Sequence, residues 1–342
     1  MSDGVRLSLD AAELLAFEAL QANRTSPEAA RITARALVAA EADGQGGHGL
    51  SRVPSYAAQA RSGKVDGFAV PWVEQIAPAA LRVDAGLGFA YPAIALALDR
   101  LVPLARSSGI AAAAIHRSHH FGQVGAHVEK LAREGLVALA FGNTPKAMAF
   151  WGGREPMLGT NPLAFASPWP DAAGAAGDAL VIDLALSVAA RGKIVAAQKA
   201  GREIPAGWAV DREGQPTTDP TAALAGTLAP IGGAKGGALA LMVEILGAAL
   251  TASAFGWEAS SFFEAAGDPP NMGHLFIAVD PQRLSGGGFA ARMQTLAAAI
   301  GSDPAVRLPG ARRLVNRTRT AREGVTIDSA LHAEILALTR AC

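Results

Sequence analysis

The chain has 342 residues, half of them hydrophobic, so it is long enough to bury a sizeable core in one large domain or in two to three smaller ones. Its 30 basic and 30 acidic residues leave no net charge, which argues against nucleic acid or an anionic membrane as a partner. The single cysteine, Cys342, excludes an internal disulfide and a thiolate metal site, and neither a signal peptide nor a transmembrane helix is predicted, so we expect a cytoplasmic protein.

Helices are predicted throughout the N-terminal part. Ser8 can cap a helix over residues 9–20, and Ser26-Pro27-Glu28 is typical of a cap followed by proline in the first turn. Apolar residues recur at helical spacing up to residue 40. The glycine-rich segment 44–49 ends this helix, and a short helix over 53–62 follows, stopped by Gly63.

From about residue 70 onward, strands and helices are mixed. Strands are predicted over residues 73–76, 81–83, 110–115, 137–141, 163–166, 179–184 and 275–279. Helices are predicted over residues 91–101, 124–134, 187–200, 235–252, 289–300 and 329–340. Because strands and helices do not alternate regularly, the pattern favours an α/β or α+β protein over a regular doubly wound parallel sheet.

The segment 44–49 also matches the glycine pattern G-x-G-x-x-G. The dinucleotide fingerprint requires a strand before that pattern and a helix that begins within it. Here a helix precedes it, so we interpret the match as accidental. Any dinucleotide would therefore bind without the usual Rossmann turn.

His48 and Arg52 are the first candidates for chemistry. Histidine is the side chain best suited to proton transfer near neutral pH, and arginine can hold a carboxylate through two parallel N–H bonds. A proton donor beside a carboxylate clamp is what the reduction of a 2-oxo or 2-imino acid requires. Spacing alone slightly favours the plainer interpretation of a capping histidine and a solvated arginine.

The segment 116–168 is dense in histidines, glycines and turns, as expected of loops that carry a site. A metal site built from His116, His119 and His120 is disfavoured, because the nearest carboxylate is Glu129 on the following helix and alternate strand side chains diverge. The turn at 120–125 opens a helix whose N–H groups suit a phosphate. The turns at 151–156 and 159–162 let a ligand approach the backbone, although ordinary turns have the same composition.

Two further positions follow along the chain. Asp183 ends a predicted strand, where it could orient His48 or cap the next helix. Lys235 lies among glycines at a helix start, which is equally typical of a phosphate-binding loop and of a solvated lysine. The full P-loop spacing is absent, so the pattern does not predict an NTPase.

These motifs together resemble the type 2 malate/L-lactate dehydrogenase family over about residues 5–340. They are, in order, His48-Gly49-x-x-Arg52, His120-Phe121-Gly122, Trp151-Gly152-Gly153-Arg154-Glu155-Pro156 with Gly159-Thr160-Asn161-Pro162, and Gly233-x-Lys235-Gly236. The resemblance implies a mixed α/β, non-Rossmann NAD(P)-binding fold around a mainly antiparallel sheet. It also implies a helical, substrate-side domain of residues 1–72 plus 300–342, a central mixed-sheet cofactor-binding region of 73–299, and a homodimer with the active site at the subunit interface.

The resemblance assigns roles to individual residues. His48 would transfer the proton with support from Asp183, while Arg52 and Thr160 would bind a small carboxylate substrate. The residues expected to line the cofactor are His120, Phe121, Gly122, Gln123, Val124, Asn143, Thr144, Asp183, Lys235, Arg307, Pro309, Gly310 and Arg313. The expected cofactor is NADP, with NAD as the alternative, and no metal is expected.

Segments 233–244 and 255–263 resemble the branch that reduces Δ1-piperideine-2-carboxylate and Δ1-pyrroline-2-carboxylate to L-pipecolate and L-proline. The alternative is a 2-hydroxy-acid dehydrogenase of malate, lactate, sulfolactate or ureidoglycolate type. Gly47 stands where many members have a serine that links the aspartate to the histidine. A water, a direct Asp183–His48 contact or a different substrate would account for it. A metal-dependent hydrolase and a non-catalytic binding relative are the interpretations from other classes.

Overall fold

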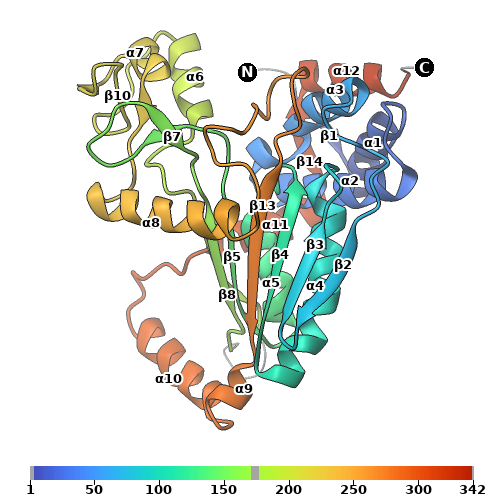
Figure 1. The fold of residues 1–342 in the computed structure, drawn as a ribbon, viewed down its shortest axis with the longest axis vertical. Helices are drawn as coiled ribbons and strands as arrows, with labels where there is room; N and C mark the ends of the chain where they lie inside the picture. Colours follow the sequence, from blue (N-terminus) through green and yellow to red (C-terminus); the bar gives the residue numbers. More distant parts are fainter. Residues whose placement is uncertain (1–3, 171–176, 341–342) are drawn as a thin grey trace.

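The computed structural model describes residues 4–170 and 177–340, so Cys342 lies outside the described part. A helical block, a long sheet and a smaller lobe make up the molecule (Figure 1). In the helical block, α1 (Leu9–Gln21) packs against α2 (Pro27–Ala42) and α3 (Val53–Ser62). The hydroxyls of Ser8 and Ser26 accept bonds from the backbone N–H groups three residues on, as predicted for N-caps.

The two ends of the chain meet in this block. Strand β1 (Gly4–Leu7) pairs antiparallel with β14 (Val325–Asp328). Helix α11 (Ala311–Glu323) packs against α2, and α12 (Ser329–Leu338) packs against α1 and α3. The C-terminal segment therefore contributes to the same core as the first helices.

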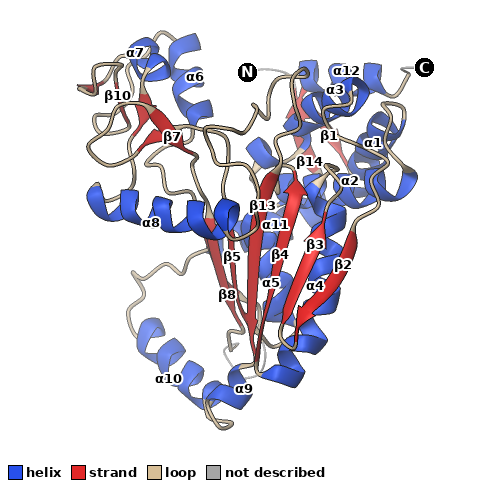
Figure 2. Cartoon of the chain, viewed as in Figure 1, coloured by secondary structure: helices blue, strands red, loops and turns tan. Residues whose placement is uncertain are grey.

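The long sheet has seven strands (Figure 2). In spatial order they are β2 (Trp72–Ala77), β3 (Ala80–Asp84), β4 (Ile110–Ser118), β13 (Met272–Val279), β5 (Val137–Gly142), β8 (Leu163–Ser167) and β9 (Leu180–Leu184). Neighbouring strands are antiparallel except β3 and β4. The predicted mixed α/β fold around a mainly antiparallel, non-Rossmann sheet is confirmed.

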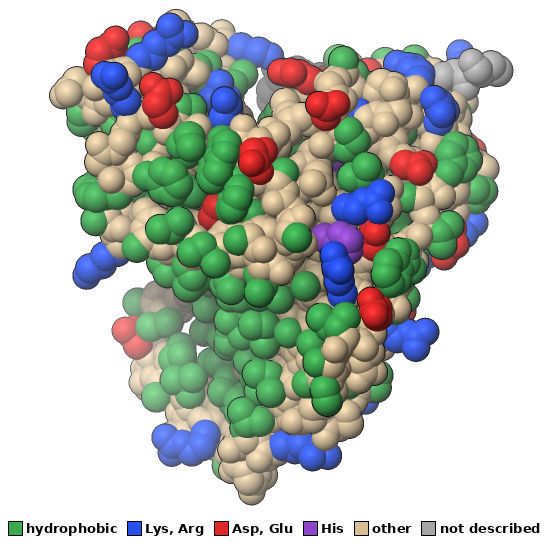
Figure 3. All heavy atoms as spheres, viewed as in Figure 1, with side chains coloured by type: hydrophobic (Ala, Val, Ile, Leu, Met, Phe, Trp, Pro, Cys, Tyr) green, Lys and Arg blue, Asp and Glu red, His purple; other side chains and the backbone are tan. Residues whose placement is uncertain are grey.

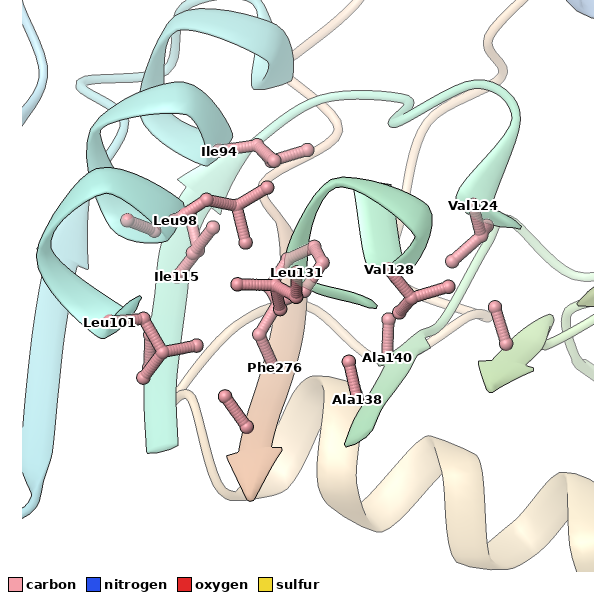
Figure 4. Packing of buried hydrophobic residues seen from close by; sticks show 14 of the residues in the cluster. Ile94, Leu98, Leu101, Ile115, Val124, Val128, Leu131, Ala138, Ala140 and Phe276 are labelled. Atoms are coloured by element: carbon pink, nitrogen blue, oxygen red, sulfur yellow. The ribbon is translucent and has the colours of Figure 1, made fainter. Parts of the chain in front are cut away.

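Alternating side chains give this sheet two apolar faces. Ala113 and Ile115 of β4 and Phe276 of β13 belong to the core formed with helices α4 (Ala90–Ser108) and α5 (Val124–Arg133) (Figure 4). Their neighbours in β4 and β13, such as Ala114 and Leu275, face a second apolar cluster on the other side. The small residues of β4 let both layers approach the sheet closely.

The second cluster belongs to the smaller lobe, which contains a five-stranded sheet. Its strands in spatial order are β11 (Pro216–Thr217), β10 (Ala209–Val210), β12 (Thr227–Leu228), β6 (Met148–Ala149) and β7 (Pro156–Leu158). Its helices are α6 (Arg191–Lys199), α7 (Pro220–Ala225) and α8 (Ala234–Glu244), and α8 continues into a π turn, η3 (Ile245–Ala249). Such short strands have no readable periodicity, which is why they were not predicted.

The last segment before α11 leaves the body of the molecule (Figure 1). A short helix, α9 (Pro281–Leu284), is followed by α10 (Phe289–Gly301), which has no buried residue. Among residues 4–170 and 177–340, none of the helices combines the length and apolarity needed to span a bilayer.

Three predicted helices need correction. The helix predicted over 91–101 extends to Ser108 through Pro103, because its buried face continues to Ala105. The helix predicted to begin at Ser187 begins at Arg191, because Ser187 pairs with Pro230 in an isolated bridge. The predicted single helix over 235–252 changes to a π turn after Glu244. Helix α11 was not predicted, because its polar sequence gives little apolar periodicity.

Candidate active site

A cavity of about 1320 Å³ lies where the helical block, the long sheet and the smaller lobe meet. Many of the predicted site residues line it: His48, Arg52, His120, Phe121, Gly122, Val124, Thr144, Thr160 and Asp183. They come from five separate stretches of the chain. The fold thus brings together the candidate proton-transfer group, the candidate carboxylate clamp and part of the predicted cofactor loop.

His48 and Arg52 lie on two consecutive 3-10 turns, η1 (Gly46–His48) and η2 (Leu50–Arg52), rather than on a helix. The Arg52 Nε donates to the Gly47 carbonyl at 2.7 Å. The Arg52 guanidinium also stacks on the Phe263 ring at 4.7 Å, while its Nη1 is buried without a protein partner. One edge of the guanidinium is therefore fixed by the chain and another is left for a ligand. We call the side of the cavity formed by His48 and Arg52 the clamp side.

The His48 ring stacks on the His120 ring, with centroids 5.3 Å apart. Burial, and secondarily the Arg52 charge, lower the pKa of His48 to about 4. Its Nδ1 is buried without a protein partner. At neutral pH this imidazole is therefore uncharged and can accept a proton or a hydrogen bond from a ligand.

His120 is held from behind by the only two tyrosines of the chain. Its Nδ1 shares a 2.6 Å hydrogen bond with the Tyr56 hydroxyl, which lies 3.4 Å from the Tyr91 hydroxyl. Burial, followed by the charge of Arg52, holds the pKa of His120 well below its usual range. A side chain at Gly122, whose φ is +67°, would collide with the Tyr91 hydroxyl, so the His-Phe-Gly motif requires glycine there. The sequence interpretation missed both tyrosines, although their rarity in this chain was a usable signal.

The other buried histidines have structural contacts. His127 Nε2 bonds to the Phe121 carbonyl at 2.8 Å, and His274 Nε2 lies 3.1 Å from both the Ser118 hydroxyl and the His119 carbonyl. His274 lies within strand β13 and no motif indicated it. In the described part of the chain, no three His, Cys, Asp or Glu side chains are grouped so as to hold a metal.

Asp183 lies at the cavity but does not hydrogen-bond to His48. Its Oδ2 accepts from the Gly125 N–H at 2.7 Å, at the start of α5. Burial raises the pKa of Asp183, and the Gly125 bond partly offsets that shift. The direct Asp183–His48 contact considered in place of the missing serine is therefore not made within this chain.

Thr144 and Thr160 form a second part of the cavity wall, the threonine side. The Thr160 N–H donates to Thr144 Oγ1 at 2.9 Å, and the two hydroxyl oxygens are 3.3 Å apart. Behind them, Asn143 and Asn161 are buried and bonded to the carboxylate of Glu244. Neither Asn161 nor Glu244 was predicted as a site residue.

The remaining predicted cofactor residues do not line the cavity. Gln123 and Arg313 are buried and contact the carboxylate of Asp43. Asn143 lies behind the threonine side. Lys235 is exposed in the first turn of α8. Arg307, Pro309 and Gly310 lie in the segment that leads into α11.

The site fits a nicotinamide cofactor and a small acid in two respects. The cavity is larger than most small-molecule pockets require, and the buried polar atoms His48 Nδ1 and Arg52 Nη1 have no partner from the chain itself. Buried polar atoms are rarely left unpaired unless a ligand or water meets them.

The chain is similar to known proteins over nearly its full length. A family model described as malate/L-lactate dehydrogenase matches residues 7–336. A (2R)-3-sulfolactate dehydrogenase (NADP(+)) from Chromohalobacter salexigens is 53% identical over 331 residues, 97% of either chain. A Δ1-pyrroline-2-carboxylate/Δ1-piperideine-2-carboxylate reductase from Pseudomonas aeruginosa is 43% identical over 337 residues, 98% of this chain and 99% of that one.

Solved structures are equally similar. The Δ1-piperideine-2-carboxylate reductase from Pseudomonas syringae superposes with a TM-score of 0.90 at 40% identity, covering 98% of this chain and 99% of that one. The sulfolactate dehydrogenase from Methanocaldococcus jannaschii has a TM-score of 0.89 at 30% identity, with 98% and 96% covered.

Proposed function

Because the chain belongs to the malate/L-lactate dehydrogenase family of oxidoreductases, we propose that it reduces a cyclic 2-imino acid to the corresponding L-amino acid with NADPH. The substrates would be Δ1-piperideine-2-carboxylate and Δ1-pyrroline-2-carboxylate, which give L-pipecolate and L-proline. The observation that carries the proposal is the free edge of the Arg52 guanidinium beside His48 in one cavity. The named reductases at 43% identity and at a TM-score of 0.90 support the imino acid as substrate.

Arg52 would bind the substrate carboxylate. Its Nε is fixed on Gly47 and its face on Phe263, so little side-chain freedom is lost when the carboxylate arrives. The aromatic rings of Phe262 and Phe263 also line the cavity, where they would contact the apolar part of a ring-shaped substrate. Thr160 would contact the substrate from the threonine side.

His48 would transfer the proton to the imine nitrogen. In the free chain its pKa of about 4 keeps it neutral, first because of burial and then because of Arg52. A carboxylate on Arg52 neutralises that positive charge and therefore raises the pKa of His48. Substrate binding would thus prepare the histidine for proton transfer. The reaction balances when one hydride adds to C2 and one proton adds to nitrogen.

Bound NADPH would supply the hydride. Its holders would be the 120–124 loop, Thr144 and Asp183, with Asn143 behind them and with Lys235, Arg307, Pro309 and Gly310 from neighbouring segments. NADP rather than NAD is supported by the name of the sulfolactate dehydrogenase at 53% identity. The guanidinium of Arg313 is already engaged by two carboxylates, so we do not assign it to the cofactor phosphate.

A second candidate is the oxidation of 3-sulfolactate, favoured by the 53% identity to a sulfolactate dehydrogenase. That substrate carries two anionic groups, and Lys146 and Arg191 line the same cavity as Arg52. His48, neutral at pH 7, would then accept the hydroxyl proton.

The active form would be a homodimer with the active site near the interface. Helix α10 has no buried residue within the chain, and an isolated helix of that length is marginal in water. Leu239, Met242 and Ile245 on α8 and η3 are also exposed, in a region where apolar side chains gather (Figure 3). A second copy that covers α10 and this face would remove both from water.

A substrate panel tests the proposed reaction. Oxidation of NADPH and NADH is followed with Δ1-piperideine-2-carboxylate, Δ1-pyrroline-2-carboxylate, oxaloacetate, pyruvate and 3-sulfopyruvate. We expect turnover of both imines, with NADPH preferred. Turnover of 3-sulfopyruvate without either imine would replace the first candidate with the second, and turnover of none would contradict both.

A further inference from the structure

We propose that Glu244 is a positioning residue for the threonine side of the active site. It touches neither the cavity nor any candidate catalytic group directly. Its carboxylate instead holds the loops that present Thr144 and Thr160. The inference rests on the proposed function only in that these threonines face the ligands.

Three segments that are distant in sequence meet on this carboxylate. Oε1 accepts from Asn143 Nδ2 at 3.1 Å and from the Gly256 N–H at 2.7 Å. Oε2 accepts from Asn161 Nδ2 at 2.7 Å. Asn143 follows strand β5, Asn161 precedes β8, and Gly256 belongs to the loop before β13. Glu244 therefore fixes the spacing of these loops relative to helix α8.

From Asn161 the order of donors and acceptors continues to the cavity. Asn161 Nδ2 donates to Glu244 and to the Ala240 carbonyl at 2.9 Å, which leaves its Oδ1 to accept from the Thr144 N–H at 3.4 Å. Thr144 Oγ1 in turn accepts from the Thr160 N–H. The amide of Asn161 cannot be turned over, because Nδ2 would then face another donor and Oδ1 would face the Ala240 carbonyl.

The charge of Glu244 matters to this arrangement. Glu244 is only 2% exposed, and its hydrogen-bond partners in the described residues are neutral N–H groups. A protonated carboxyl would present a hydrogen where one of these groups donates. Burying a carboxylate without a cation is costly, so its presence here favours a role in local geometry over a role in global stability.

Helix α8 changes its winding at this residue. The α-helix ends at Glu244 and the π turn η3 begins at Ile245, a feature that is frequent at functional sites. A Cβ at Gly247 would lie 2.7 Å from the Asn143 N, so the turn packs directly against the backbone that precedes Thr144. The helix and the carboxylate hold the same loop from two directions.

The test compares Glu244→Gln with Glu258→Gln. Glu258 accepts from the Phe255 N–H at 2.9 Å in the same loop but does not bond to Asn143 or Asn161, so it is a matched control. In Glu244→Gln the new NH₂ group meets the NH₂ of Asn161 or the N–H of Gly256. We expect kcat/KM to fall about 10–100-fold, with KM and the NADPH Kd raised, as expected for a misplaced wall. Glu258→Gln should stay within about twofold.

The split between KM and kcat separates positioning from a structural role. Loss of folded protein lowers apparent kcat in proportion to the active fraction and leaves KM and the NADPH Kd unchanged. If Glu244→Gln behaves in that way, or stays within about twofold of the parent, the proposal is wrong.

The double variant Glu244→Gln/Asn161→Asp keeps the proposal testable if the single variant does not fold. It exchanges the positions of the charge and the amide, and restores an acceptor both for the NH₂ group introduced at position 244 and for the Thr144 N–H. We expect it to recover part of the NADPH affinity and of kcat/KM, whereas a double variant that folds without any recovery contradicts the proposal. Whichever substrate the parent enzyme turns over is used, so a failed proposed function appears in the parent and a failed positioning role only in the ratio.

Discussion

Two buried glutamates lie behind the two sides of the active-site cavity and differ in almost every other respect. Glu129, on α5, is bonded to the guanidinium groups of Arg313 and Arg317 and to the exposed Arg133. Glu244, on α8, is bonded to two side-chain amides and one backbone N–H. The comparison shows how the same side chain can stabilise a fold in one place and shape a site in the other.

The pKa values of the two groups move in opposite directions. Burial opposes the charge of Glu129, but hydrogen bonds from Arg317 and Arg313 outweigh it and lower the pKa to about 2. Burial raises the pKa of Glu244, and bonds from Asn161, Gly256 and Asn143 offset only part of the shift. Cations compensate a buried carboxylate, whereas neutral donors merely orient it.

The ion network also has a place in the architecture. Arg313 and Arg317 of α11 bridge Glu129 to Asp43, the residue that ends α2 immediately before the turn of His48. Gln123, next to the His-Phe-Gly motif, donates to the same Asp43 at 2.9 Å. The network thus joins three helices behind the clamp side.

The largest expected effect is on stability. Arg313→Met leaves Asp43 and Glu129 with one fewer buried cation, and removal of one partner from a buried pair costs about 3–5 kcal/mol. Urea unfolding of Arg133→Met, which removes only the half-exposed partner of Glu129, should show a loss of at most about 1 kcal/mol. Measured on folded protein, the NADPH Kd should be unchanged in both.

An Arg313→Met variant that keeps its stability but loses affinity for NADPH and not for NADH would reverse this interpretation. Arg313 would then bind the cofactor phosphate, as the family resemblance predicts, and the ion network would be incidental to the fold.

A smaller effect is expected from the carboxylate clamp. Arg52→Lys removes the two-pronged geometry and the bond from Nε to the Gly47 carbonyl, although the positive charge remains. We expect KM for the substrate to rise about 10–100-fold, while the Kd for NADPH stays the same and serves as the internal control. An unchanged KM would show that the substrate carboxylate binds elsewhere.

The acid stability of the protein should separate the two glutamates with a modest slope, at most about 1.4 kcal/mol per pH unit for each proton. The pKa of Glu129 is lower in the folded state, so its stabilisation is present above pH 4.5 and is lost as the pH falls toward 2. The pKa of Glu244 is raised, so its contribution is present below pH 4.5 and is lost as the pH rises through the folded value.

Urea midpoints measured from pH 3 to 7 check both signs. Glu129→Gln should flatten the loss of stability in acid relative to the parent, and Glu244→Gln should remove a component that weakens with rising pH. The same pH dependence in both variants would mean that the two carboxylates have similar environments.

The sequence predicted the groups that chemistry makes recognisable. The motifs of His48, Arg52, His120 and Thr160 have characteristic neighbours, and the fold brings all four to one cavity. The long strands and the capped helices were also predictable, because their periodicity and caps are local. The glycine pattern at 44–49 was correctly set aside, since a helix precedes it.

The supporting groups could not be predicted, because their partners are remote. Glu244 contacts Asn143 and Asn161, which are 101 and 83 residues away. Arg313 contacts Asp43 across 270 residues, and nothing in the surrounding sequence distinguishes it from a solvated arginine. Two-residue strands such as β10 and β12 form only because tertiary packing aligns them.

The smallest effect is expected at Gly47, the one departure from the family pattern. An added Cβ there would have no atom of the chain within 4 Å, and Gly47 is not among the glycines with positive φ. Gly47→Ser should therefore change stability by at most about 0.5 kcal/mol. Because the Gly47 carbonyl already holds Arg52, the peptide should keep its orientation and place a hydroxyl one residue before His48. We expect kcat to change less than about tenfold, with a shifted apparent pKa in its pH profile. A loss above about 1 kcal/mol would mean that a second subunit fills the open space, which would place Gly47 in the interface rather than in a proton path.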